Sequence, residues 1–166
     1  MTSSKIVKEV QTLIGRIATF NRFISKVTDI CLPFFKTLKQ AFAWTNECEE
    51  AFQELKCYLS SPPFLSPSKE GEDLFLYLAM STTAMSAALI QEENRVQLPV
   101  YYVSQASQGV EARYPCMEKI VFSLIIALRK LPPYFQANHI LVMTDQPIKK
   151  SINKPKAVGR MIQCAI

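Results

Sequence analysis

Residues 74–103, with the sequence LFLYLAMSTTAMSAALIQEENRVQLPVYYV, decide the fold class of this chain. Three segments of this stretch, 74–79, 84–91 and 98–103, are rich in apolar residues and are separated by two short polar turns. The pattern predicts three strands joined by hairpin turns. Because Pro99 has no backbone N–H to donate, its strand is expected to lie at a sheet edge or to begin there.

The chain that follows predicts a strand parallel to the earlier ones. Apolar residues recur at steps of three and four over residues 118–130, which indicates a helix. A short apolar segment, 140–143, is expected to form a fourth strand, and a further helix is predicted from residue 146. Residues 63–166 therefore predict a mixed α/β sheet of order β-β-β-α-β-α with a parallel crossover.

Residues 1–62 predict a separate, all-helical segment. The apolar periodicity indicates one amphipathic helix over residues 6–27, a short helix with Pro33 in its first turn, and a third helix that begins after the N-cap Thr45. Gly15 lies inside the first of these, where glycine costs about 1 kcal/mol relative to alanine. A close contact with another helix is the expected reason for this glycine.

The composition excludes several classes of protein. With 49% apolar and 20% charged residues, the 166-residue chain is not intrinsically disordered. It shows neither an uninterrupted apolar span nor a secretory signal, so no membrane association and a cytoplasmic or nuclear location are expected. Its five cysteines are not clustered and His139 is the single histidine, so a zinc site is excluded and the cysteines are expected to be buried free thiols.

The net charge of +5 is unevenly distributed. Up to residue 44 there are seven Lys/Arg against two Asp/Glu, over 45–113 four against ten, and from 114 onward eight against two. Two basic ends of this kind suit a polyanion such as nucleic acid, although a solvated basic face without a partner explains them equally well. The candidate nucleic-acid contacts are Lys5, Lys8, Arg16, Arg22, Lys26, Lys149, Lys150, Lys154, Lys156 and Arg160.

Several motifs resemble one known family. Residues 76–91, LYLAMSTTAMSAALIQ, resemble the pattern L-x-x-D-A-S-x-x-A-x-G-A-V-L-x-Q, which opens the RNase H-like domain of gypsy-type LTR retrotransposon polyproteins. Residues 99–104, residues 114–120 and the pair Thr144-Asp145 are similar to its later motifs, and residues 8–63 are similar to the thumb-to-connection segment before it. The closest resemblance is to plant retroelements, and it implies a domain incomplete at its C-terminus.

The family uses a cluster of carboxylates to hold two divalent metals. Carried over by position, the first three of these carboxylates fall on Ala79, Ile120 and Asp145, of which Asp145 alone can bind a metal. Asp73 lies about 20 Å from Ala79 along an extended strand, and Glu118 is expected on the opposite helix face from Ile120. No catalytic residue, no metal site and no cofactor are therefore expected, and Asp145 is also explained as a helix N-cap.

The resemblance implies a connection-like module of a reverse transcriptase polyprotein, catalytically inactive and bound to the backbone of an RNA–DNA hybrid or duplex. Its partners would be nucleic acid and the rest of the polyprotein. One alternative is an active RNase H that uses Mg²⁺, and another is a degenerate or domesticated fragment that acts through protein contacts. Four aromatic residues are candidates for base stacking or, alternatively, for core packing. They are Tyr101, Tyr102, Tyr134 and Phe135.

Overall fold

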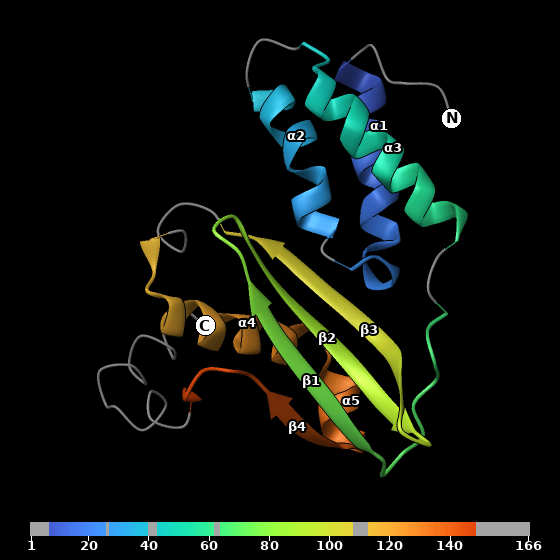
Figure 1. The fold of residues 1–166 in the computed structure, drawn as a ribbon, viewed down its shortest axis with the longest axis vertical. Helices are drawn as coiled ribbons and strands as arrows, with labels where there is room; N and C mark the ends of the chain where they lie inside the picture. Colours follow the sequence, from blue (N-terminus) through green and yellow to red (C-terminus); the bar gives the residue numbers. More distant parts are fainter. Residues whose placement is uncertain (1–6, 26, 40–42, 62–63, 108–112, 149–166) are drawn as a thin grey trace.

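The computed structural model describes residues 7–25, 27–39, 43–61, 64–107 and 113–148, and shows a helical unit joined to a mixed sheet with helices behind it (Figure 1). This is the mixed α/β class that the sequence predicts. The elements in chain order are α1 (Val7–Thr19), η1 (Asn21–Phe23), α2 (Val27–Lys39), α3 (Asn46–Ser60), β1 (Asp73–Met80), β2 (Ala84–Glu93), β3 (Val96–Ala106), α4 (Cys116–Lys130), α5 (Pro132–Ala137) and β4 (His139–Met143).

The sheet has the strand order β3-β2-β1-β4. β1 pairs antiparallel with β2 and parallel with β4, which confirms the predicted crossover. Along β1, Leu74, Leu76 and Leu78 are buried, and they pack into one hydrophobic cluster with the buried residues of α4. This alternation, with a period of two residues, assigns the even-numbered side chains of β1 to the face that α4 covers.

The edge position predicted for Pro99 is confirmed, because β3 is the last strand on its side of the described sheet. Leu89 pairs with Tyr101 and Ile90 with Pro99, so the register shifts by one residue there and Val100 has no partner in β2. The shift is a β-bulge, a common device at sheet edges. The carbonyl of Pro99 accepts a hydrogen bond from the Ser66 N–H at 2.7 Å.

The single helix predicted over residues 6–27 is wrong, because α1 ends at Thr19 and α2 begins at Val27. The apolar periodicity continues through this break because Ile24, in the connecting turn, is buried in the same core. Pro33 lies inside α2 and not in the first turn of a separate helix. A proline there removes the hydrogen bond to the carbonyl four residues earlier, a cost that packing of the apolar face has to offset.

A short helix that the sequence did not predict, α5, begins at Pro132, since a proline fits the first turn of a helix. The helix predicted from residue 146 falls almost entirely outside the described residues. The N-cap at Thr45 is confirmed, because its hydroxyl accepts a hydrogen bond from the Cys48 N–H at 3.4 Å.

The helical unit has its own hydrophobic core, built around Phe34 and Phe52. Cys31 and Cys48 are buried in it, as expected for free thiols, and burial raises the pKa of Cys31 to about 12. The same expectation is wrong for Cys57 and Cys116, which are exposed. In the described part of the chain, no helix has both the length and the hydrophobicity that crossing a membrane requires.

Gly15 does not make the close contact expected of it, since a Cβ built there meets no atom within 4 Å. We predict that Gly15→Ala raises the free energy of unfolding by about 1 kcal/mol, because alanine loses less backbone entropy in a helix. Gly71 is the control: with a φ of +82° it adopts a conformation that an L side chain rarely does. Gly71→Ala is expected to destabilise, and urea unfolding that moved both variants in one direction would contradict this account.

Candidate functional site

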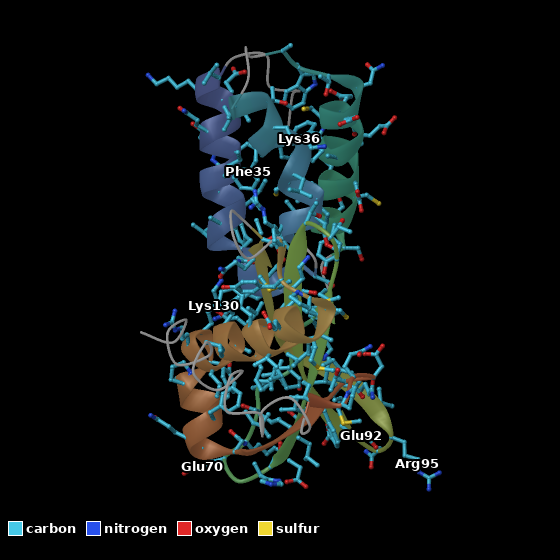
Figure 2. The ribbon with its side chains drawn as sticks, turned by 90° about the vertical axis from the view of Figure 1, so that its left-hand side faces the viewer. Phe35, Lys36, Glu70, Glu92, Arg95 and Lys130 are labelled. Atoms are coloured by element: carbon cyan, nitrogen blue, oxygen red, sulfur yellow. The ribbon has the colours of Figure 1, made fainter. Side chains whose placement is uncertain are left out.

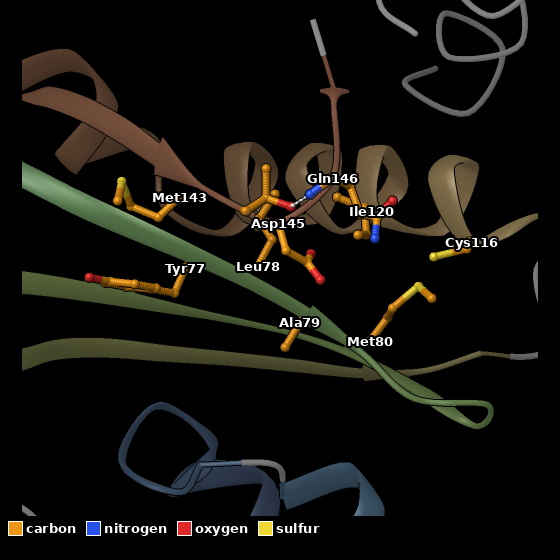
Figure 3. Close-up of a pocket in the computed structure, with 10 residues that line it drawn as sticks. Tyr77, Leu78, Ala79, Met80, Cys116, Ile120, Met143, Asp145 and Gln146 are labelled. Carbon is orange, nitrogen blue, oxygen red and sulfur yellow. Dashed lines mark hydrogen bonds between the residues drawn. The ribbon is translucent and has the colours of Figure 1, made fainter. Parts of the chain in front are cut away.

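An open cleft of about 560 Å³ lies at the carboxyl ends of β1 and β4, beside the first turns of α4 (Figure 3). Ends of adjacent parallel strands commonly form binding sites in α/β sheets. The lining residues are Tyr77, Leu78, Ala79, Met80, Cys116, Ile120, Met143, Thr144, Asp145 and Gln146.

All three positions that the resemblance equates with RNase H carboxylates line this cleft. Ala79 comes from β1, Ile120 from α4 and Asp145 from the segment after β4. They are far apart in the sequence, and the parallel pairing of β1 with β4 brings the strand ends together. The fold thus brings the three positions to one cleft, where only Asp145 carries a carboxylate.

The two replaced positions differ in environment. Ile120 is 3% exposed and belongs to the core that α4 forms with the sheet. Ala79 is exposed, because Leu78 points toward α4 and the next residue along a strand points to the other face (Figure 3). A polar side chain is therefore compatible with position 79, whereas position 120 contributes to the packing of the domain.

Asp145 supplies the only carboxylate among the residues that line the cleft. It is exposed and forms no hydrogen bond with another described residue; beside it, the Gln146 N–H donates to the Thr144 hydroxyl at 3.2 Å. Whether Asp145 caps a following helix falls outside the described residues. Over the parts of the chain that the structure describes, no three His, Cys, Asp or Glu side chains are grouped closely enough to hold a metal.

The two acids that could have replaced carboxylates at positions 79 and 120 do not line the cleft. Asp73 lies at the opposite end of β1, where its Oδ1 is 3.1 Å from Nδ1 of His139, and both side chains are largely exposed. Glu118 does not line the cleft. A pair of Mg²⁺ ions requires several Asp or Glu oxygens, and among the cleft-lining residues only Asp145 supplies them. The described residues therefore do not fit the family's metal centre.

Of the predicted nucleic-acid contacts, the structure describes three, Lys8, Arg16 and Arg22, and all are exposed. Lys8 and Arg16 lie on α1, and the guanidinium of Arg22 lies 4.5 Å from the centre of the Phe23 ring. The remaining seven fall outside the described residues. They are Lys5, Lys26, Lys149, Lys150, Lys154, Lys156 and Arg160.

The aromatic candidates have packing roles. Tyr101 meets Tyr134 edge to face, with ring centres 6.1 Å apart, and Phe135 packs against the sheet core. Tyr102 has a raised pKa, first because it is partly buried and second because Tyr58 of α3 lies nearby. The sequence did not single out Cys116 for the cleft. Its position at the start of α4, two residues after the family-like Tyr114, was the available signal.

Substitution by the family's carboxylates should reveal the different environments of Ala79 and Ile120. We predict that Ala79→Asp changes the free energy of unfolding by no more than about 0.5 kcal/mol, because the site is exposed. Ile120→Glu should cost about 3 kcal/mol or more, since it buries a carboxyl group and removes core packing. Chemical denaturation would measure both, with Ile120→Val as the control for lost volume alone; equal losses for the two carboxylate variants would contradict the assignment.

The chain is similar in sequence to a known protein family and to transposon polyproteins. Residues 44–142 match the model of the RNase H-like domain found in reverse transcriptase, a match that includes α3. A retrovirus-related Pol polyprotein from transposon 412 of Drosophila melanogaster is 30% identical over 128 residues, covering 76% of this chain and 10% of the relative. The Tf2-3 transposon polyprotein of Schizosaccharomyces pombe is 25% identical over 157 residues, covering 93% and 11%.

Solved structures agree on the fold. A foamy viral protease-reverse transcriptase solved with double-stranded DNA superimposes with a TM-score of 0.78 at 18% identity, over 99% of this chain and 30% of that one. Another, solved with an RNA/DNA hybrid, has a TM-score of 0.74 at 19% identity, over 99% and 24%. The chain spans about a tenth of the length of the curated relatives it matches. It belongs to the family of RNase H-like domains found in the reverse transcriptases of retrotransposon and retroviral polyproteins.

Proposed function

We propose that this chain is a catalytically inactive RNase H-like module of a plant-like, gypsy-type retrotransposon polyprotein, which binds the backbone of an RNA–DNA hybrid or duplex. In this role it resembles the connection domain of a reverse transcriptase. The observation that carries the proposal is the cleft itself: it contains all three family-equivalent positions and a single carboxylate, that of Asp145.

Electrostatics supports the absence of catalysis. Two-metal cleavage requires two doubly charged ions about 3.5–4 Å apart, whose mutual repulsion the surrounding carboxylates must offset. Asp145 brings one negative charge, while Ala79 and Ile120 bring none. Since Ile120 is part of the core, the wall it forms is apolar and cannot replace the water ligands that a cation gives up.

The basic residues of α1 and the similarity to nucleic-acid-bound structures support the proposed binding of a nucleic-acid backbone. The strongly basic segment up to residue 44 includes the exposed Lys8 and Arg16 of α1. Lysine and arginine that contact phosphates give affinity with little sequence preference. The foamy viral structures with the same fold contain double-stranded DNA or an RNA/DNA hybrid. A backbone-binding module is the function that these observations favour.

A module that acts through protein contacts is the second candidate. In the described sheet β4 is an edge strand, and its residues Val142 and Met143 are 37% and 39% exposed. An open edge with apolar side chains is a surface where another chain can add a strand. This candidate does not require any affinity for nucleic acid.

The full chain is expected not to cleave a labelled RNA–DNA hybrid in the presence of Mg²⁺ or Mn²⁺. The measurement is product formation on a denaturing gel, with an active RNase H as the positive control and Asp145→Asn as the matched variant. Background cleavage should be identical in the wild type and Asp145→Asn. Metal-dependent cleavage that Asp145→Asn abolishes would establish the active enzyme instead.

Binding of the chain to a hybrid should weaken steeply between 50 and 200 mM salt. Each phosphate contact that is lost should reduce the slope of log K against log salt by about 0.9. We therefore expect Lys8→Gln combined with Arg16→Gln to flatten the slope by about 1 to 2 in fluorescence anisotropy. Lys69→Gln, at an exposed lysine that pairs with Glu72, is the control for the loss of one surface charge outside α1. Affinity that is independent of salt would favour the protein-contact candidate.

A further inference from the structure

A second hollow, of about 280 Å³, lies where the end of α1 and η1 meet β3 and the end of α4; we call it the junction groove. In Figure 2, Lys130 lies at the level where the helical unit meets the sheet. Three separate parts of the chain therefore form its walls. The lining residues are Ala18, Thr19, Asn21, Arg22, Tyr101, Tyr102, Val103 and Lys130.

The junction groove combines two cations with no lining carboxylate. Arg22 comes from η1 and Lys130 from the last turn of α4, and neither forms an ion pair with another described residue. The ring of Phe23 lies against the guanidinium of Arg22, which limits the orientations that this side chain takes. Lys130 is exposed by accessible surface, but neighbouring protein atoms displace part of its hydration, which lowers its pKa. A charge that has lost hydration without gaining a counter-ion favours an anionic ligand.

Two tyrosines add neutral donors. Tyr101 and Tyr102 both line the junction groove, and the hydroxyl of neither has a hydrogen-bond partner among the described residues. Tyr58, in contrast, is fully used: it accepts from the Ser25 N–H at 3.1 Å and donates to the Phe23 carbonyl at 3.2 Å. Adjacent residues of a strand point to opposite faces, and accordingly Tyr101 packs against Tyr134 whereas Tyr102 lies near Tyr58, so only one of the two hydroxyls can donate to a given phosphate.

The size of the groove limits the ligand. Pockets for small molecules typically have volumes of about 300–1,000 Å³ and are mostly apolar, whereas the junction groove is smaller and carries both cations. A guanidinium, an ammonium and hydroxyls are the donors that recognise phosphate oxygens. Arg16 of α1, three residues before Thr19 of the groove, adds a further positive charge along that helix. A phosphate within a longer polyanion fits this arrangement better than an isolated ion.

We propose that the junction groove is a phosphate subsite for the nucleic-acid backbone, in which Arg22 and Lys130 supply the charge and one tyrosine hydroxyl supplies a further donor. This inference rests on the proposed function, because it names the place where the backbone would be held. It also assigns a role to Lys130, which the sequence did not single out. Its location is separate from the cleft that contains Asp145, so it does not depend on whether that cleft is catalytic.

The test uses the full chain and the double variant Arg22→Gln with Lys130→Gln. At 100 mM salt its Kd for an RNA–DNA hybrid should rise about 10-fold or more, because charge-assisted hydrogen bonds to a phosphate are lost. The salt slope should also flatten by about 1. Arg95→Gln is the control: this exposed arginine lies in the β2–β3 turn, far from Lys130 (Figure 2), and its replacement should leave both quantities nearly unchanged.

Charge-retaining variants separate binding from folding. Arg22→Lys and Lys130→Arg should keep most of the affinity, and thermal melting of every variant checks that it is folded. If the double variant binds the hybrid as Arg95→Gln does, the phosphate subsite is refuted while backbone binding elsewhere stands. If the wild type binds no hybrid, the proposed function and the subsite both fall. If inorganic phosphate, titrated at constant ionic strength, displaces the hybrid at micromolar concentration, the groove is a free-anion site and the inference is refuted.

Discussion

The pairing of β1 determines the rest of the structure. It is antiparallel to β2 and parallel to β4, and it buries Leu74, Leu76 and Leu78 against α4. A shift of one residue would expose all three leucines, so the apolar alternation fixes the register strongly. This register also decides what the cleft contains. Since Leu78 is committed to the core, Ala79 lies on the other face at the strand end, where the family has its first carboxylate.

The second constraint is the contact that holds the helical unit against the sheet. The Oδ1 atom of Asp29 in α2 accepts hydrogen bonds from the hydroxyls of Ser81 and Thr83, each at 3.2 Å, in the turn between β1 and β2. Ser81 also accepts from the Ala84 N–H at 2.9 Å, so it stabilises the turn and the contact together. The serine in the family-like motif therefore has a structural role that does not depend on catalysis. η1 makes its own contact with β3, where the junction groove lies.

The sequence predicted the parts of the fold whose signals are local. Strict alternation predicts β1, and a hydroxyl one residue before an acidic turn predicts the cap at Thr45. The break between α1 and α2 was not predictable in this way, because Ile24 in the turn is as buried as a helical residue would be. In the site, the three positions that the motif singled out, Ala79, Ile120 and Asp145, line one cleft. The meeting of Arg22 with Lys130 had no local signal, since it depends on how η1 crosses β3.

The loss of carboxylates has a consequence for binding that is separate from catalysis. In an active RNase H-like site, the bound metals offset the negative charge of the acids. Without metals, carboxylates at positions 79 and 120 would repel that backbone across a short distance in partly desolvated surroundings. Ala79 and Ile120 remove this repulsion, and Ile120 also adds apolar contact to the core. The residues that line the cleft include one acid, whereas those that line the separate junction groove include two cations and no acid, which supports the proposal that the chain holds a polyanion.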